Sequence, residues 1–175
     1  MNGTMKDFVL PTVVLAVICL VVSAALSGTY GMTNPIIEEN KRIAEQEALA
    51  EVLPAGDTFE TASGALPDGV SALYTAQNGA GCVVQVSPAG YGGPISMMVG
   101  LDAQGAISGV KVLENTETQG IGSKVMDASY TEQYVGKASA DEVDAIGGAT
   151  ISSTGLKNGI RTAMEAAAAV GKGEK

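Results

Sequence analysis

Histidine is absent from this 175-residue sequence, and there are only two cysteines. Without histidine the chain lacks the usual general base at neutral pH, the triad of a serine hydrolase and most ligand sets for zinc, haem and copper. Cys19 lies in an apolar stretch and Cys82 in a soluble one, so they predict neither a disulfide nor an iron–sulfur motif. Redox chemistry would therefore have to come from a bound organic cofactor or from a cysteine.

Basic residues are also scarce. The chain has 10 Lys and Arg against 19 Asp and Glu, a net charge of −9, and nearly all of these charges lie beyond residue 37. An acidic domain is repelled by nucleic acid and by anionic lipid surfaces, so no nucleic-acid partner is expected. The length allows one membrane segment and one modest domain.

The N-terminal region is a long uncharged run. Residues 8–37 carry no charged side chain, and they are mostly apolar up to residue 26. This length suits a helix that crosses about 30 Å of hydrocarbon, so residues 1–33 are predicted to be a single-pass transmembrane anchor in contact with membrane lipid. A cleavable signal peptide is the alternative, because residues 23–25 are small, although the run exceeds the roughly 7 to 15 residues of a typical apolar signal region.

A second helix is predicted after the anchor. Asn34-Pro35 fits a helix start, and apolar residues recur at near-helical spacing until Pro54 ends the run. We interpret residues 34–54 as a helical stalk that continues from the anchor. Its spacing favours a solvated amphipathic connector over a helix that binds a partner.

Residues 55–175 are predicted to form one small domain. After a loop over 55–68, strands are expected over 70–77, 82–87, 95–101 and 107–113, the last two flanking a hairpin turn. A short helix or loop over 124–137 would turn Met126, Tyr130 and Tyr134 inward, and a helix is expected over 153–170. The predicted fold class is α+β: a transmembrane helix and stalk, then a small antiparallel sheet with a C-terminal helix.

The most informative stretch is Asp144-Ala-Ile-Gly-Gly-Ala-Thr-Ile-Ser-Ser153. Gly148 and Ala149 let backbone approach backbone just before the hydroxyl of Thr150, and Ser152 and Ser153 follow. The N-terminal N–H groups of the next helix favour an anion such as phosphate. An isolated threonine in this place would more simply be a helix cap.

Two other segments carry residues suited to a ligand. In the first, Gly120 and Gly122 would let main-chain amides approach a flat ring, Ile121 offers an apolar contact and Lys124 a cation. Glu117 and Thr118 can order this loop or hydrogen-bond the ligand, although the same residues also fit a glycine-rich surface turn. The second segment is Gly90-Tyr-Gly-Gly93, whose tyrosine could lie against a ring or pack over the turn.

These three segments are ordered and spaced as in a known family. Residues 144–150 resemble the Asp-x-x-(Ser/Thr)-Gly-Ala-Thr signature of FMN-binding domains, and residues 117–124 resemble their Glu-Thr-Pro-Gly-Leu-Gly-x-Lys loop. The chain is similar to G subunits of Rnf electron-transport complexes, which are related to the C subunit of the sodium-pumping NADH:quinone reductase. It departs from the pattern at Asn115, often His in the family, at Gln119, usually Pro, and at Gly147, usually Ser or Thr.

The resemblance implies FMN, held as a phosphoester on Thr150, which would be an attachment point and not a catalyst. A flavin transferase would move FMN from FAD to the hydroxyl and release AMP. No metal is expected. The implied cofactor-binding residues are Thr150, Tyr91, Gly92, Glu117, Thr118, Gly120, Ile121, Gly122, Lys124, Asp144, Gly148, Ala149, Ser152 and Ser153.

The resemblance also implies a function. The chain would be an electron-transfer subunit, not catalytic alone, of a membrane-bound ferredoxin:NAD oxidoreductase that couples electron flow to sodium or proton translocation. Its partners would be the other membrane and peripheral subunits, with the FMN domain on the extracytoplasmic side of the cell membrane. The alternatives are the equivalent, usually longer, subunit of the sodium-pumping NADH:quinone reductase and a membrane-anchored binding module without a redox role.

Overall fold

The computed structural model describes residues 2–62 and 66–170, and it divides the chain into two units, Met1–Ile43 and Ala44–Lys175. Residue 1 of the expected anchor, residues 63–65 of the expected loop and residues 171–175 of the expected domain lie outside the described residues. The described part of the first unit is entirely helical, and the second unit contains the sheet.

Helix α1 runs without a break from Asn2 to Val52 and contains both Pro11 and Pro35. The predicted helix start at Asn34-Pro35 is therefore not a separate start, but the predicted continuation of the stalk from the anchor is confirmed. A proline inside a helix removes one backbone hydrogen bond and costs about 3 kcal/mol. The helical turns on either side of each proline are unbroken, so their hydrogen bonds offset this cost.

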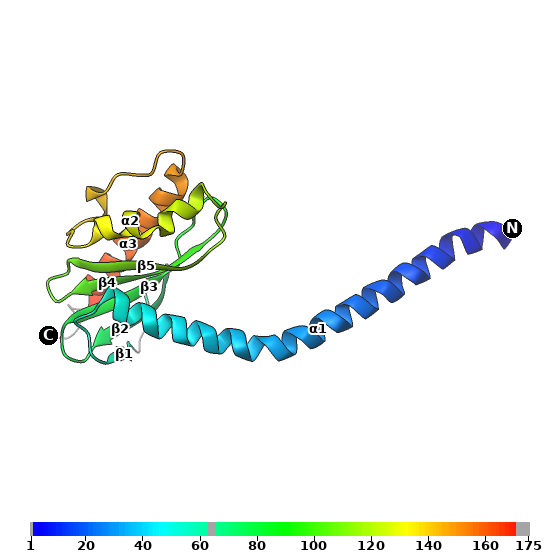
Figure 1. Ribbon diagram of the computed structural model, residues 1–175, viewed down its shortest axis with the longest axis horizontal. Helices are drawn as coiled ribbons and strands as arrows, with labels where there is room; N and C mark the ends of the chain where they lie inside the picture. Colours follow the sequence, from blue (N-terminus) through cyan, green and yellow to red (C-terminus); the bar gives the residue numbers. More distant parts are fainter. Residues whose placement is uncertain (1, 63–65, 171–175) are drawn as a thin grey trace. The chain divides into compact units, whose positions relative to one another are not determined.

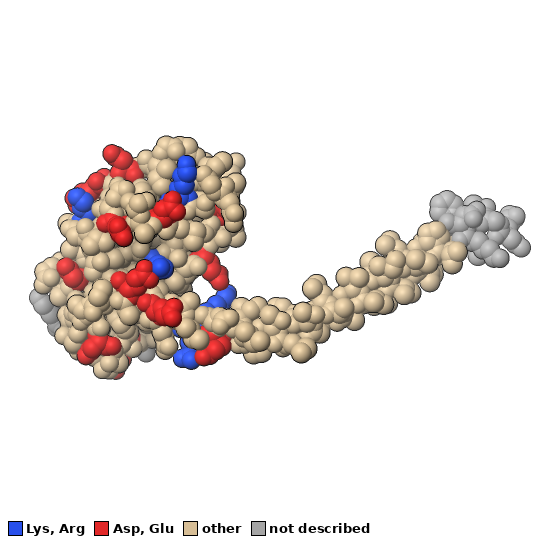
Figure 2. Space-filling model, in the orientation of Figure 1, with Lys and Arg blue, Asp and Glu red and all other residues tan. Residues whose placement is uncertain are grey.

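The first unit exposes apolar side chains along its helix. Leu10, Leu20 and Leu26 are 66%, 71% and 70% exposed. The stretch Val9–Val52 contains a segment long and apolar enough to cross a membrane, and Figure 2 shows a long uncharged surface along this helix. Burying a leucine side chain contributes about 2 kcal/mol, so this surface is favourable in lipid and unfavourable in water. The structure fits the membrane helix that the sequence predicted.

The second unit is built on one five-stranded antiparallel sheet whose strands lie in chain order. The strands are β1 (Phe59–Thr61), β2 (Val70–Ala76), β3 (Gly81–Val86), β4 (Ile95–Asp102) and β5 (Ile107–Asn115). The last four were predicted to within two residues at each end. The loop prediction missed β1, because its three residues show no alternation and become a strand only by pairing with β2.

Both faces of the sheet are buried. Val84 and Met97 belong to the cluster that packs against helix α3 (Thr150–Val170), whereas Val83 and Met98 belong to the cluster on the opposite face. Figure 1 shows α3 lying against the strands. Double burial explains why β4 is apolar along nearly its whole length, since a strand covered on both sides has no polar face.

The C-terminal end of α1 is part of this second cluster, which corrects the prediction of a solvated connector. Ala48, Leu49 and Val52 of α1, and Leu53 just after it, are at most 7% exposed. The Ser108 hydroxyl on β5 also donates to the Val52 carbonyl at 2.6 Å. The apolar spacing was visible in the sequence, but its packing partner was not.

Four short helical segments connect β5 to α3: η1 (Gly122–Met126), α2 (Ala128–Thr131), η2 (Glu132–Tyr134) and η3 (Ala140–Glu142). Tyr130 and Tyr134 are 5% and 0% exposed, as predicted, and their rings meet edge to face. Met126 was wrongly predicted to point inward, since it is 38% exposed. Its neighbour Val125 fills the core instead, because η1 is a tight 3₁₀ turn whose side-chain directions an α-helical pattern does not describe.

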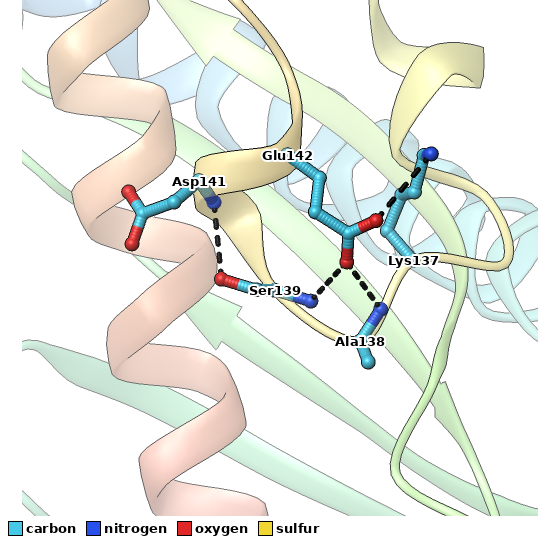
Figure 3. A network of polar contacts seen from close by, with 5 residues as sticks. All are labelled: Lys137, Ala138, Ser139, Asp141 and Glu142. Carbon is cyan, nitrogen blue, oxygen red and sulfur yellow. Dashed lines mark hydrogen bonds and ion pairs between the residues drawn. The ribbon is translucent and has the colours of Figure 1, made fainter.

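Residues 137–142, here called the Glu142 corner, lead the chain towards α3. One oxygen of Glu142 accepts hydrogen bonds from the N–H groups of Ala138 and Ser139, both at 3.2 Å, and the other pairs with Lys137 at 3.4 Å. The Ser139 hydroxyl accepts from the Asp141 N–H and completes a capping box (Figure 3). Local polar contacts therefore fix the conformation of the segment that precedes Asp144.

Candidate functional site

A pocket of about 410 Å³ lies where three segments meet: the turn around Tyr91, the loop over residues 117–122 and the N-terminal end of α3. Its volume falls within the range of small-ligand pockets, about 300 to 1,000 Å³. Its lining residues are Tyr91, Glu117, Thr118, Ile121, Gly122, Gly148, Ala149, Thr150, Ile151 and Ser152.

Helix α3 begins at Thr150, three residues earlier than predicted, so the lining includes its first turn. The first N–H groups of a helix have no partner within it, and here the Ser153 N–H is bonded to the Ala149 carbonyl at 2.9 Å. The methyl side chain of Ala149 cannot accept a hydrogen bond from the earlier amides. Gly148 turns the chain into the helix with φ +81°, a conformation that favours glycine. This helix start can therefore hold an anion.

The three hydroxyls at the helix start differ in availability. Ser152 is 2% exposed and donates to Glu117 at 2.8 Å. Ser153 is 0% exposed and donates to the Ala149 carbonyl at 2.8 Å. Thr150 is exposed and lines the pocket, and its hydroxyl has no hydrogen-bond partner among the described residues. Of the three, only Thr150 offers an oxygen for attachment.

One buried carboxylate joins the three segments of the pocket. Glu117 is 8% exposed, and its Oε1 accepts from the N–H groups of Tyr91 at 2.7 Å and Gly92 at 3.3 Å. Its Oε2 accepts from the Ser152 hydroxyl at 2.8 Å. We call this set the Glu117 clamp. It fixes the turn, the loop and the helix start relative to one another.

The rim of the pocket is apolar. Tyr91, Ile121 and Ile151 are 72%, 55% and 57% exposed, and each comes from a different one of the three segments. Large apolar side chains this exposed around one opening suit a flat aromatic ligand. The pocket therefore combines an anion-binding helix start with an apolar rim.

The loop over 117–122 is ordered by its own hydrogen bonds, although Gln119 stands where the family often has proline. The Asn115 side chain accepts from the Glu117 N–H at 2.8 Å, and the Gly120 N–H donates to the Ser123 hydroxyl at 2.9 Å. The Thr118 carbonyl accepts from the Ser123 N–H at 3.2 Å. These bonds take the place of the restriction that a proline would impose.

Five of the residues implied by the resemblance do not line the pocket: Gly92, Gly120, Lys124, Asp144 and Ser153. Gly92 contributes its N–H to the Glu117 clamp, and the Ser153 hydroxyl braces the helix start. Asp144 is exposed, and its backbone carbonyl accepts from the Tyr130 hydroxyl at 3.1 Å. Lys124 is exposed on η1 and does not line the pocket. The positive charge that the pocket offers is therefore the partial charge at the N-terminal end of α3.

Ile151 is a lining residue that the sequence analysis missed. It stands between Thr150 and Ser152 in a helix start otherwise made of small and hydroxyl side chains. A large apolar residue among these small and hydroxyl side chains was the feature of the sequence that could have indicated a contact with the ligand.

Cys82 does not line the pocket. Burial raises the pKa of the Cys82 thiol, which disfavours the reactive thiolate. Among the described side chains, those of residues 9–62 and 66–169, no group of three or more Cys, Asp or Glu could hold a metal ion.

Comparison with known proteins identifies two family models along the chain. The model of the FMN-binding domain matches residues 90–165, which contain all three pocket segments. The model of the RnfG N-terminal region matches residues 1–52, the range of helix α1.

Curated relatives align over most of their length. The chain is 29% identical to the G subunit of the ion-translocating oxidoreductase complex of Methanosarcina acetivorans, over 91% of this chain and 94% of the relative. It is 28% identical to the G subunit of the Na⁺-translocating ferredoxin:NAD⁺ oxidoreductase complex of Acetobacterium woodii, over 87% of each. It is 23% identical to the proton-translocating counterpart of Clostridium ljungdahlii, over 86% of each. With both family models matched in order and these relatives aligned along it, the chain is similar over nearly its whole length to G subunits of ion-translocating oxidoreductase complexes.

Proposed function

We propose that this chain is an electron-transfer subunit that carries FMN covalently on Thr150 within a membrane-bound, Rnf-type ferredoxin:NAD oxidoreductase. The complex would couple electron flow to sodium or proton translocation. One observation carries the proposal: of the three residues with hydroxyls at the start of α3, Thr150 alone is exposed and has a hydroxyl without a hydrogen-bond partner in the described part of the chain, and it stands beside unpaired helix N–H groups.

The residues present fit FMN. The N–H groups at the start of α3 would hold the phosphate, and Tyr91, Ile121 and Ile151 would contact the flat ring system. When bound, FMN supplies the electron-accepting and electron-donating chemistry, and the protein tunes it through burial, hydrogen bonds and charge.

Attachment would be a phosphoryl-group transfer assisted by a flavin transferase. The Thr150 oxygen forms a bond to the phosphorus on the FMN side of FAD, the pyrophosphate bond breaks, AMP leaves and the hydroxyl proton passes to solvent. A tether of this kind matters on the extracytoplasmic side of a membrane, because a dissociated flavin would be lost by dilution. Thr150 serves as the anchor and takes no part in electron transfer.

The proposed placement is a single-pass membrane subunit with the FMN domain on the extracytoplasmic side, beside the other subunits of the complex. The apolar helix and the names of the relatives support a membrane complex. The match of residues 1–52 to the RnfG N-terminal region favours this complex over the related quinone reductase.

Intact-mass analysis of the chain purified from membranes tests the proposal. We expect the wild type to exceed its amino-acid mass by one FMN phosphoester, and Thr150→Ala to lose that increment completely. Thr154→Ala is the matched control, since Thr154 is an exposed hydroxyl on the same helix that does not line the pocket, and it should keep the flavin. Both substitutions should change the free energy of unfolding by less than about 0.5 kcal/mol. A wild type without added mass, or a flavin retained by Thr150→Ala, contradicts the proposal.

A further inference from the structure

We propose that Glu117 is a fixed negative charge in the wall of the flavin pocket, and that this charge lowers the reduction potential of the flavin carried on Thr150. The inference rests on the proposed function, and it adds a residue that tunes the cofactor in place. It follows from the burial, the contacts and the position of one side chain.

Glu117 has the contacts of an anion. The groups that contact its two oxygens, the N–H groups of Tyr91 and Gly92 and the hydroxyl of Ser152, can all donate to it. Hydrogen bonds donated by such groups stabilise the negative charge of a carboxylate. In the described part of the chain, Glu117 forms no ion pair, and no Lys or Arg lines the pocket. The charge is held by dipoles and is not neutralised by a cation.

The charge of Glu117 is close enough to the pocket to change the reduction potential of a flavin bound there. Glu117 is 8% exposed and lines the pocket, so water screens it less than it screens a surface carboxylate. In a pocket of about 410 Å³ the wall lies within about 10 Å of any occupant, where one unit charge changes an equilibrium roughly tenfold at an effective dielectric constant near 20. Reduction adds negative charge to a flavin, and a neighbouring anion opposes this. The positive end of α3 acts in the other direction, but it is the same in wild type and variant and does not enter their difference.

A second role for Glu117 is structural, and Glu117→Gln separates the two. Glutamine has nearly the same shape. Its carbonyl oxygen can accept from the N–H groups of Tyr91 and Gly92, and its NH₂ group can donate to the Ser152 oxygen, which is also an acceptor. The substitution therefore keeps the Glu117 clamp and removes its charge.

The test uses the full chain in detergent, purified from cells that attach the flavin. Intact mass measures flavin content, a spectroscopic redox titration measures the midpoint potential of the bound flavin, and urea unfolding measures the fold. Glu117→Gln should keep the flavin, and its potential should become less negative by an amount equal to a roughly tenfold change in the equilibrium constant, about 30 mV for a two-electron couple. The matched control is Glu142→Gln, because that carboxylate also accepts from two backbone N–H groups but does not line the pocket. It should leave the potential unchanged.

The outcomes separate the proposals. A wild type without flavin mass overturns the proposed function, and this inference with it, before any variant is compared. A flavin-bearing Glu117→Gln with the wild-type potential overturns this inference alone and leaves Glu117 a structural residue. If Glu117→Gln fails to fold or to take flavin, Ser152→Ala decides, because it keeps the charge and removes one of its donors. The flavin of Ser152→Ala should then have a more negative potential, and an unchanged or less negative value overturns the inference.

Discussion

Glu117 and Glu142 perform the same local task in opposite surroundings. Each accepts hydrogen bonds from the N–H groups of two consecutive residues through one oxygen. The bonds of Glu142 reach three and four residues along the chain, its side chain is 43% exposed, and it pairs with Lys137. The bonds of Glu117 reach 25, 26 and 35 residues, and the residue is 8% exposed. The comparison teaches that the same chemistry orders one corner when exposed and assembles a whole pocket when buried.

Alanine substitutions at Glu117 and at Glu142 should give the largest difference in the free energy of unfolding between the two sites. Glu117→Ala leaves two N–H groups and one hydroxyl without their acceptor in a buried place, so we expect a loss of about 3 kcal/mol in the free energy of unfolding. Glu142→Ala removes half of an exposed capping box and should cost about 1 kcal/mol. Urea unfolding of the full chain in detergent, followed by tyrosine fluorescence, measures both. Equal losses would show that burial does not distinguish the two carboxylates.

A smaller loss of stability is expected at Gly122, where the Glu117 side chain leaves no room for a Cβ atom. A Cβ at Gly122 would overlap Glu117 Oε2, whereas a Cβ at Gly147 would meet nothing within 4 Å. We therefore expect Gly122→Ala to cost about 2 kcal/mol through displacement of the carboxylate. Gly147→Ala should change the free energy of unfolding by less than about 0.5 kcal/mol. The same urea titration provides the measurement, and a Gly122→Ala variant as stable as Gly147→Ala would show that Glu117 can move at little cost.

The smallest effect concerns the buried hydroxyl pair of Tyr130 and Tyr134, which contacts the backbone at Asp144. Tyr130 and Tyr134 lie with their oxygens 3.0 Å apart, and Tyr130 also donates to the Asp144 carbonyl. Burial, and then the hydrogen bond with Tyr130, raises the pKa of Tyr134 far above its ordinary value of 10.0. The folded chain therefore keeps this proton where the unfolded chain loses it. This contribution to stability is complete below pH 10 and is lost as the pH rises above it.

Tyr134→Phe tests that dependence. Above pH 10 the wild type should lose at most about 1.4 kcal/mol of unfolding free energy per pH unit from this group. The variant should lack this part of the slope, after a loss of about 1 kcal/mol at neutral pH for the missing hydrogen bond. Unfolding followed by circular dichroism between pH 8 and pH 11 measures both, since tyrosine fluorescence itself changes there. Identical slopes would mean that the Tyr134 hydroxyl is accessible to solvent in the folded chain.

Local patterns predicted most of the fold. The uncharged run indicated the membrane helix, the alternating and apolar runs indicated strands β2 to β5, and the hairpin turn was visible as Asp102 to Gly105. Strand β1 and the packing of Val52 were missed, because each depends on a partner distant in the sequence. The inward position predicted for Met126 failed because an α-helical period was applied to a 3₁₀ turn.

By itself, the sequence determined the long apolar N-terminal helix, the antiparallel sheet, the absence of histidine chemistry and the glycine-supported helix start near Thr150. These depend on composition and on residues close to one another along the chain. Only the tertiary structure decided that Thr150 is open while Ser152 and Ser153 are used, that Lys124 lies outside the pocket, and that Glu117 joins its three walls. The physical reason is that these outcomes depend on burial and on hydrogen bonds between segments far apart in the chain, which exist only after the sheet and α3 have packed.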